Sequence, residues 1–384
     1  DAETLDGIPF PMLLRDALYH DTTLAEALTR INNATRTNEY HYCISGLDPS
    51  GEPDARLLFT SNTRFDEFGG GDPVLPHPYY EPFYEPLADV VYWKRHDGGA
   101  YAMPGPEDDR KGNQTLYAAI NARYGAIDAE KAIEIAIADG VDGTVVSIVY
   151  DTTAKRFWVA FAEGATIPAQ YRNYVEFDLN GPAGIGGSGY RTSVGSGTEE
   201  IPVIVVSGTS CEMGYQYGQL MQAEIQEFVP EFLAYSQQEE PALTDAVLDA
   251  AWEATAPHTD DRYEQELLGL AAGSGVDYMS LRRAHCVMIV APYSCSSVAA
   301  WGPATSNGHL YQTRDLDWDL SANSQAYPLI AIYIPEQGQP HVNPIAAGLA
   351  GAHTGMNTAG IALAEMGNSP SGEYPYGLDG THFM

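Results

Sequence analysis

The change in hydrophobic pattern at Ala291-Pro292 constrains the fold of this chain more than any other feature. Before it, from about Gly208 to residue 289, apolar residues recur at helical spacing, which predicts a block of consecutive helices. After it the period becomes two, which predicts strands over residues 297–301, 310–314 and 328–334. Asn307-Gly308 is a strong hairpin signal because both residues accept a positive φ. Cys295 therefore starts a β-hairpin directly after a helical block.

The rest of the chain mixes helices and strands, so we expect an α+β fold. The helices expected from apolar periodicity cover residues 12–18, 23–31, 114–124, 128–139, 210–237, 243–253, 262–272 and 278–289. The remaining strands are expected at residues 40–45, 55–60, 89–93, 144–150, 156–161, 174–179, 202–207 and 361–365. Residues 66–112 suggest long loops around a single strand. The Gly- and Ser-rich stretch from Gly181 to Gly197 has the composition of a flexible spacer.

Composition excludes several classes of function. The net charge of −33, from 52 acidic and 19 basic residues, argues against affinity for nucleic acid or an anionic membrane. No apolar run approaches the ~20 residues that a membrane helix needs. The four cysteines and the histidines show no metal-ligand spacing, so we expect neither a metal nor another cofactor. The compartment, secreted, periplasmic or cytoplasmic, and the oligomeric state are left open.

We interpret Cys295 as a nucleophile. Arg314-x-x-Asp317 follows it across one hairpin, and antiparallel pairing returns both charges towards the start of the first strand. Cleavage of the Ser294-Cys295 bond would free an α-amine, whose reference pKa of about 7.7–8.0 suits a general base at neutral pH. The thiol could then attack a carbonyl without a catalytic histidine. We expect Asp317 to accept hydrogen bonds from the new ammonium or the thiol, and Arg314 to hold Asp317 or a substrate oxygen.

These residues also carry a resemblance to a known family, the acyl-coenzyme A:isopenicillin N acyltransferase family of N-terminal nucleophile (Ntn) cysteine hydrolases. The matching segments are Gly208-Thr209 to Gly218, Cys295-Ser296-Ser297, Asp317-Trp318, Gly355-x-Asn357-x-Ala359-Gly360, Gly7-Ile8-Pro9 with Leu14-Arg15-x-Ala17-Leu18, and Thr144 to Asp151. The Arg314-x-x-Asp317 spacing also resembles penicillin V acylases and bile salt hydrolases. The resemblance implies autoproteolysis before Cys295, hydrolysis of a non-peptide amide or acyl transfer through a Cys295 thioester, and a small-molecule substrate. The aromatic, Tyr-rich loops of this chain favour an acyl group with apolar character.

The matching segments occur in a rotated order. Residues 200–384 correspond to the start of a conventional member and residues 1–180 to its end, so the resemblance implies a circular permutation. The implied fold is a four-layer αββα sandwich with an added helical block, forming one structural domain. Its parts would be a C-terminal half at residues 1–180, a joining linker at 181–199, a strand and helical block at 200–294, and the nucleophile-bearing half at 295–384.

The chain also departs from the family. The acyltransferases carry a Thr-Asn-His segment whose asparagine helps to form the oxyanion hole, and the corresponding strand here, Val90 to Lys94, lacks it. Asn62, His96 or Asn357 is a candidate replacement, and Glu365 is a candidate for the pocket lining. Two alternatives stay open: an inactive Ntn-fold protein that serves as a binding or scaffold protein, and an ordinary cysteine hydrolase with a distant histidine partner.

Overall fold

The fold is built on two β-sheets. The computed structural model describes residues 4–37, 40–72, 85–94, 106–180, 189–290 and 294–367. One sheet has nine strands in the order β3 (Phe65–Phe68), β2 (Pro53–Thr60), β1 (Tyr40–Leu47), β15 (Ala362–Gly367), β14 (Thr354–Asn357), β13 (His341–Ala346), β12 (Pro328–Pro335), β9 (Ile201–Gly208) and β8 (Tyr190–Val194). The other has six, in the order β4 (Val90–Lys94), β10 (Ser294–Gly302), β11 (Gly308–Asp317), β5 (Thr144–Asp151), β6 (Arg156–Phe161) and β7 (Val175–Asp178).

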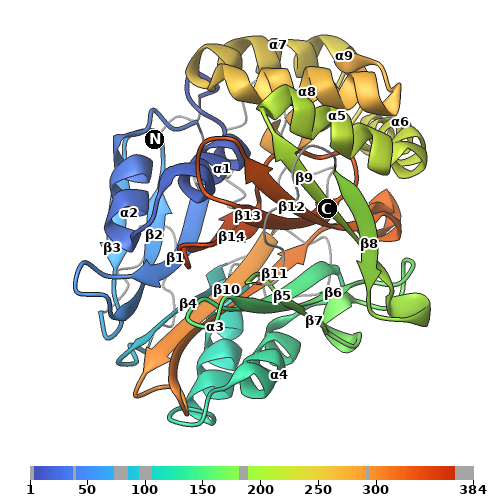
Figure 1. Cartoon of the computed structure of the whole chain (residues 1–384). Coiled ribbons are helices and arrows are strands. Elements are labelled where there is room, and N and C mark those ends of the chain that lie inside the picture. The colour runs from blue at the N-terminus through green and yellow to red at the C-terminus, as the bar shows by residue number, and fades with distance from the viewer. Residues whose placement is uncertain are drawn as a thin grey trace.

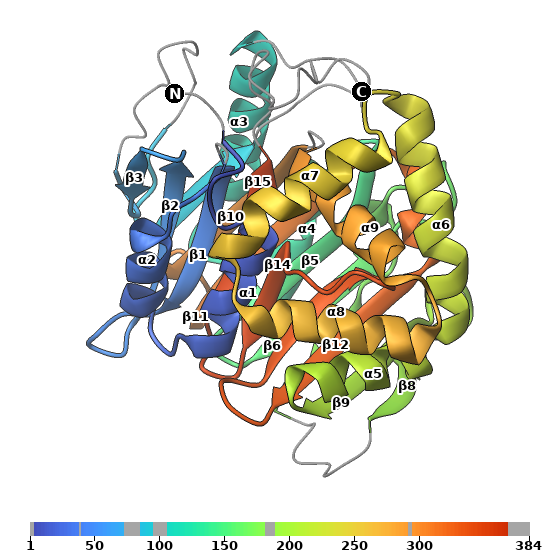
Figure 2. The ribbon, with the colours of Figure 1, turned by 90° about the horizontal axis from the view of Figure 1, so that it is seen from above.

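Helices cover the outer face of each sheet, so that the described residues form four layers (Figure 1). Helices α3 (Pro106–Asn121) and α4 (Ala129–Asp139) pack on the six-stranded sheet. The nine-stranded sheet is covered by α1 (Phe10–His20), α2 (Leu24–Asn33), α5 (Ser210–Leu220), α6 (Gln222–Glu239), α7 (Asp245–Thr255), α8 (Asp261–Ser274) and α9 (Tyr278–Val290). Figure 2 shows the last five as one block over β12 and β9. Both sheets combine strands from before residue 180 with strands from after residue 189.

Alternation along the strands decides which side chains enter the core between the sheets. In β5, Ile148 and Tyr150 face the nine-stranded sheet, where they join Ile330 and Ile332 of β12 in one buried cluster. Val149, between them, faces the other way and packs with the α3 and α4 residues. Each strand of the six-stranded sheet thus has an inner face, towards the other sheet, and an outer face, towards α3 and α4.

Four glycines bring α5 and α8 into close contact. They occur as Gly214 and Gly218 on α5 and as Gly269 and Gly273 on α8. A Cβ atom at Gly214 would lie 2.0 Å from the carbonyl oxygen of Glu266, and one at Gly269 would lie 2.1 Å from that of Cys211. Only glycine permits this approach of two backbones. Gly214 and Gly218 of the Gly208-to-Gly218 motif therefore have a packing role in this structure.

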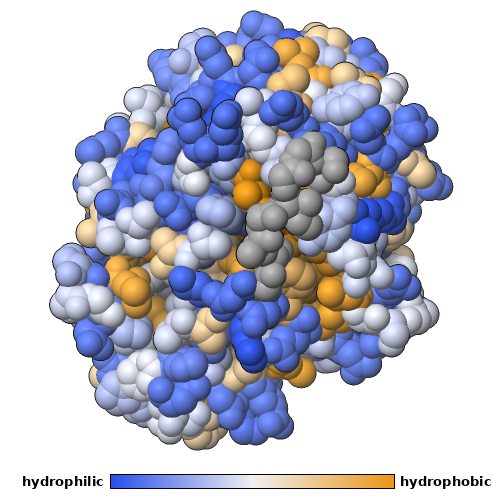
Figure 3. Space-filling view, in the orientation of Figure 1, coloured by the Kyte–Doolittle hydropathy of each residue, from blue (hydrophilic) through white to orange (hydrophobic). Residues whose placement is uncertain are grey.

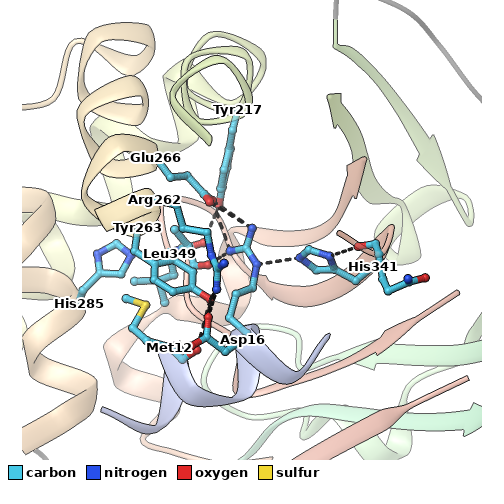
Figure 4. Close-up of polar contacts among 12 residues, drawn as sticks. Met12, Asp16, Tyr217, Arg262, Tyr263, Glu266, His285, His341 and Leu349 are labelled. Atoms are coloured by element: carbon cyan, nitrogen blue, oxygen red, sulfur yellow. Dashed lines mark hydrogen bonds and ion pairs between the residues drawn. The ribbon is translucent and has the colours of Figure 1, made fainter. Parts of the chain in front are cut away.

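A buried ion pair joins the helical block to α1 and to the sheet (Figure 4). Arg15 of α1 and Glu266 of α8 are both 2% exposed, and Arg15 Nη2 lies 3.2 Å from Glu266 Oε2. Arg15 Nε donates to His341 Nε2 at 2.8 Å, and Nη1 donates to the carbonyl oxygen of Ala350. The guanidinium carbon also lies 3.8 Å from the centre of the Tyr333 ring. The donors of Arg15 thus reach three separate segments of the fold.

Several expected elements need correction. The helix expected over 210–237 is two helices, because the backbone leaves the helical region at Met221. Residues 190–194, expected within a flexible linker, form β8 at the edge of the nine-stranded sheet. The region expected as loops at 66–112 holds part of β3 and the start of α3, residues 106–112, and β13 was not expected at all.

The hydrophilic surface of the protein is consistent with its many acidic residues. The face seen in Figure 1 is largely hydrophilic, with smaller apolar areas (Figure 3). Within the ranges that the structure describes, no helix has the length and apolar character required to cross a membrane.

Candidate active site

Cys295 lies in the core between the two sheets. It is the second residue of β10, is 1% exposed, and belongs to the buried cluster that includes Trp93 of β4 and Ala364 of β15. Burial raises the pKa of its thiol above the ordinary value, and the charge of Arg314 opposes this rise. In the uncut chain the sulfur is therefore a neutral thiol, which is a poor nucleophile.

Arg314 is the side chain that contacts this sulfur. It extends from the inner face of β11, is fully buried, and its Nη2 donates to Cys295 Sγ at 3.1 Å. The same nitrogen lies 3.4 Å from the carbonyl oxygen of Glu365 and 3.9 Å from its Oε2. The structure thus brings Cys295, Arg314 and Glu365 together. Within the described part of the chain no histidine donates to or accepts from the sulfur.

Asp317 lies on the other side of the sheet, which corrects the expected arrangement. Its backbone is paired with Ser294, the residue before the expected cut, and its Oδ1 accepts a hydrogen bond from Thr144 Oγ1 at 2.7 Å. Arg314 therefore contacts the thiol and Glu365 directly, and its charge acts on Asp317 by lowering the pKa of that carboxyl group. Burial raises the pKa of Asp317 to about 7, while Thr144 and Lys94 act to lower it and Asp139 acts to raise it.

Further charged groups surround Asp317 on the outer face of the six-stranded sheet. Strand register places Lys94 of β4, Ser296 of β10 and Asp315 of β11 side by side in one row. Asp139, the last residue of α4, covers this row, and Lys94 Nζ lies 3.3 Å from its Oδ1. We call Lys94, Asp139, Asp315 and Asp317, with Ser296 between them, the outer-face cluster. Burial, Asp139 and Asp317 all raise the pKa of Asp315 well above its usual value.

The sequence reasoning missed most of this cluster, although two signals were present. Lys94 ends the otherwise apolar strand Val90–Lys94, and a lysine that is only 3% exposed needs a buried partner. Asp139 ends a helix, where the helix dipole disfavours an acid unless a cation is near. Among the described residues there is no group of three or more His, Cys, Asp or Glu that could hold a metal ion.

The structure places the three residues expected to be candidates for the oxyanion hole, Asn357, Asn62 and His96, in different situations. Asn357 Nδ2 donates to the carbonyl oxygens of Leu18 and Asp21, and its Oδ1 accepts from the backbone of Ala359 and Ile361. Because its amide is fully used in fastening α1 to the turn before β15, we do not assign it to the oxyanion hole. Asn62 follows β2 and is half-buried. His96 lies outside the described residues.

A mostly apolar cavity adjoins Arg314. It lies where the two sheets meet the helical block, and its volume is about 40 Å³, counted as space open to the centre of a water molecule. Its apolar wall includes Val146, Phe228, Phe232, Leu316, Trp318 and Leu349. Polar groups come from Arg314, Thr354 and His353, and burial lowers the pKa of His353 to about 3, so that this ring is neutral.

Comparison with known proteins finds partial relatives. No family model matches the chain. Protein dcd1B of Dictyostelium discoideum is 31% identical over 169 residues, which cover 38% of this chain and 33% of dcd1B. Protein dcd1A of the same organism is 28% identical over 158 residues, covering 35% of this chain and 36% of dcd1A. An uncharacterized protein of Archaeoglobus fulgidus is 26% identical over 205 residues, covering 46% of this chain and 34% of the archaeal protein. Each match thus spans about a third of the relative.

Proposed function

We propose that this protein is a cysteine amidase or acyltransferase that cuts its own Ser294-Cys295 bond and uses the freed Cys295 as an N-terminal nucleophile. The observation that carries the proposal is the placement of two charges on either side of that bond. Arg314 donates to the sulfur on the inner face, and Asp317 is paired with Ser294 across the strands. A cysteine that served only the core would not need a buried guanidinium on its sulfur.

The chemistry follows from these positions. After the cut, the α-amine of Cys295 takes the thiol proton, and the sulfur attacks the carbonyl carbon of an amide. Arg314 stabilises the negative charge that develops on the sulfur. The leaving amine takes the proton from the α-ammonium, and a thioester on Cys295 remains. Water or a second amine then attacks the thioester, which gives hydrolysis or acyl transfer.

The cavity beside Arg314 supports a substrate with an apolar acyl group. The aromatic rings of Phe228, Phe232 and Trp318 line it, and so does Arg314, which donates to the reacting sulfur. Burial of an acyl chain there would stabilise the complex by roughly 0.8 kcal/mol for each methylene group.

We also propose that the fold is an Ntn sandwich and that the chain is a circular permutation of it. The four layers of helices, sheet, sheet and helices support the first point. The second is supported by the pairing of β1 with β15, the first and last described strands of the nine-stranded sheet in chain order. Strands near the two ends of the chain are thus neighbours in space, as a permutation requires.

Mass spectrometry of the purified full chain tests the function. We expect one fragment that ends at Ser294 and one that begins at Cys295, and neither in the Cys295→Ala variant. A panel of N-acyl amides with apolar acyl groups then tests turnover, with and without an added amine as a second acceptor. An intact wild-type chain that hydrolyses no member of the panel would contradict the proposal and favour a binding or scaffold protein.

A further inference from the structure

The cavity that Arg314 lines has an open side next to the nucleophile. Of its described lining residues, Leu316, Trp318 and Ser324 are half-buried, and all three come from the end of β11 or from the segment that follows it. The other lining residues are buried. Leu316 is also the register partner of Cys295 across β10 and β11. The open side of the cavity therefore lies beside Cys295.

The inner end of the cavity is formed by side chains of the helical block. Phe228 and Phe232, one turn apart on α6, are 1% and 2% exposed, and their ring centroids lie 5.2 Å apart. Met288 of α9 lines the cavity with them. These three residues belong to the buried cluster of the helical block, whereas Cys295 belongs to a different cluster, and Trp318 packs against both. The aromatic pair therefore lines the part of the cavity that lies away from the sulfur.

The volume of the cavity limits the size of an acyl group that can enter it. Its 40 Å³ is room for roughly three water molecules, because one buried water needs ~10–15 Å³ when the volume is counted in this way. A methylene group is about as large as a water molecule, so a chain of roughly three or four carbon atoms beyond the carbonyl group fills the space. A longer chain would meet the rings of Phe228 and Phe232, which are close-packed and yield only at a cost.

We propose that Phe228 and Phe232 set the length of the acyl group, so that the substrates are amides of short apolar acyl groups with about four or five carbon atoms. This inference rests on the proposed function and specifies the class of acyl group that the enzyme accepts. The carbonyl carbon lies at Cys295, the amine part lies on the open side beside Leu316, and the acyl chain points towards α6. The two phenylalanines determine specificity and take no part in breaking the amide bond.

A cavity with a closed inner end gives a characteristic dependence of kcat/KM on chain length. Each methylene group that leaves water for the cavity should raise kcat/KM by roughly fourfold, until the chain reaches the two rings. One further carbon atom must displace a close-packed aromatic side chain, so kcat/KM should then fall by about tenfold. The profile therefore has a maximum, whereas an open groove would give a kcat/KM that keeps rising with chain length.

The chain-length profile of hydrolysis tests the inference. We measure kcat/KM of the purified full chain on linear N-acyl amides of one chromogenic aniline, from acetyl to dodecanoyl, and expect the wild-type maximum at butanoyl or pentanoyl. Phe228→Ala and Phe232→Ala each remove one ring from the inner end, so each should move the maximum up by roughly three carbon atoms. Ala346→Leu adds volume to the cavity wall and should move the maximum down by about two.

Phe157→Ala is the matched control. Phe157 is fully buried in β6 but is not among the lining residues of the cavity, so its truncation should lower stability to a similar extent and leave the maximum in place. Circular dichroism identifies any variant that does not fold, and the milder Phe232→Leu then replaces Phe232→Ala. A maximum at the same length in the wild type and in the Phe232 variant, or a wild-type kcat/KM that rises all the way to dodecanoyl, would overturn this inference and leave the proposed function standing. A wild-type chain that hydrolyses no member of the series would overturn both.

Discussion

Two buried charge networks in this protein differ in their balance. Around Arg15 one cation faces one anion, Glu266, and the remaining donors of the guanidinium reach His341 and the carbonyl oxygen of Ala350. Among the described side chains, the outer-face cluster places Asp139, Asp315 and Asp317 near one lysine, and the Ser296 hydroxyl has no described partner. A balanced network gains from fixed geometry, so it suits the fastening of helices. In the outer-face cluster the pKa values of Asp315 and Asp317 are raised, and buried acids with raised pKa values are typical of sites that carry out chemistry.

The largest effect is expected from Asp317→Asn in the active chain. The asparagine cannot bind the new ammonium as a carboxylate does, so that cutting and amide turnover should each slow by roughly 10²–10⁴-fold. Fragment quantification and initial rates measure this, and circular dichroism should show an unchanged fold. A wild-type rate would remove Asp317 from the site.

The balanced network should respond in stability and not in chemistry. Arg15→Met leaves Glu266 buried without its cation, which should lower the free energy of unfolding by about 3–5 kcal/mol. Denaturant titration in the Cys295→Ala background measures it, since no cut then complicates unfolding. The rate of cutting should stay at the wild-type value in the otherwise wild-type chain. A changed rate would show that the two networks are coupled.

The unbalanced cluster should cost stability in the uncut chain as pH rises. The pKa of Asp317 is about 7 when folded, against about 3.9 when unfolded, so the folded state binds the proton more tightly. The contribution of this bound proton to the unfolding free energy is fully present below pH ~3.9, and it is lost as pH rises through ~7. At alkaline pH, Cys295→Ala/Asp317→Asn should therefore exceed Cys295→Ala in unfolding free energy by on the order of 3 kcal/mol. The difference in unfolding free energy between these two variants should disappear at acid pH. A difference that stays constant with pH would contradict the raised pKa of Asp317.

The smallest effect is expected when both partners of the balanced pair are replaced. Arg15→Met with Glu266→Leu leaves no buried charge alone, so the unfolding free energy should return to within about 1–2 kcal/mol of the parent. The double variant is compared with each single variant by denaturant titration. Additive losses would mean that Arg15 and Glu266 act independently of one another.

The sequence allowed good prediction where local chemistry decides the structure. The N-cap oxygens expected before the helix at residue 24 are supplied by Thr23, which forms a capping box with Glu26, and Asp260 caps α8 as expected. The strand that begins near Cys295 and its hairpin partner were also found. By contrast β8, with the sequence YRTSV, has no apolar alternation, because it is an edge strand that pairs only with β9.

The candidate site was predicted in part. Hairpin register correctly brings Arg314 back to Cys295. Asp317 was expected to accept hydrogen bonds from the new ammonium or from the thiol. Because residues three apart in a strand point to opposite faces, its carboxyl group does not share the face of the thiol. Lys94 and Asp139 come from β4 and α4, far away in the sequence, so that only the pairing of β4 with β10 and the packing of α4 bring them to the site. No local pattern could show that.

The strand order has one more consequence for a chain cut before Cys295. The piece from residue 295 supplies β10 and β11, which lie between β4 and β5, and β12 to β15, which lie between β9 and β1. The two pieces would share backbone hydrogen bonds on both sides of both sheets and remain one particle. Refolding after denaturation would then be a bimolecular reaction and would depend on protein concentration. Such a protein folds once as a single chain, and loss of that fold in a dilute solution is close to permanent.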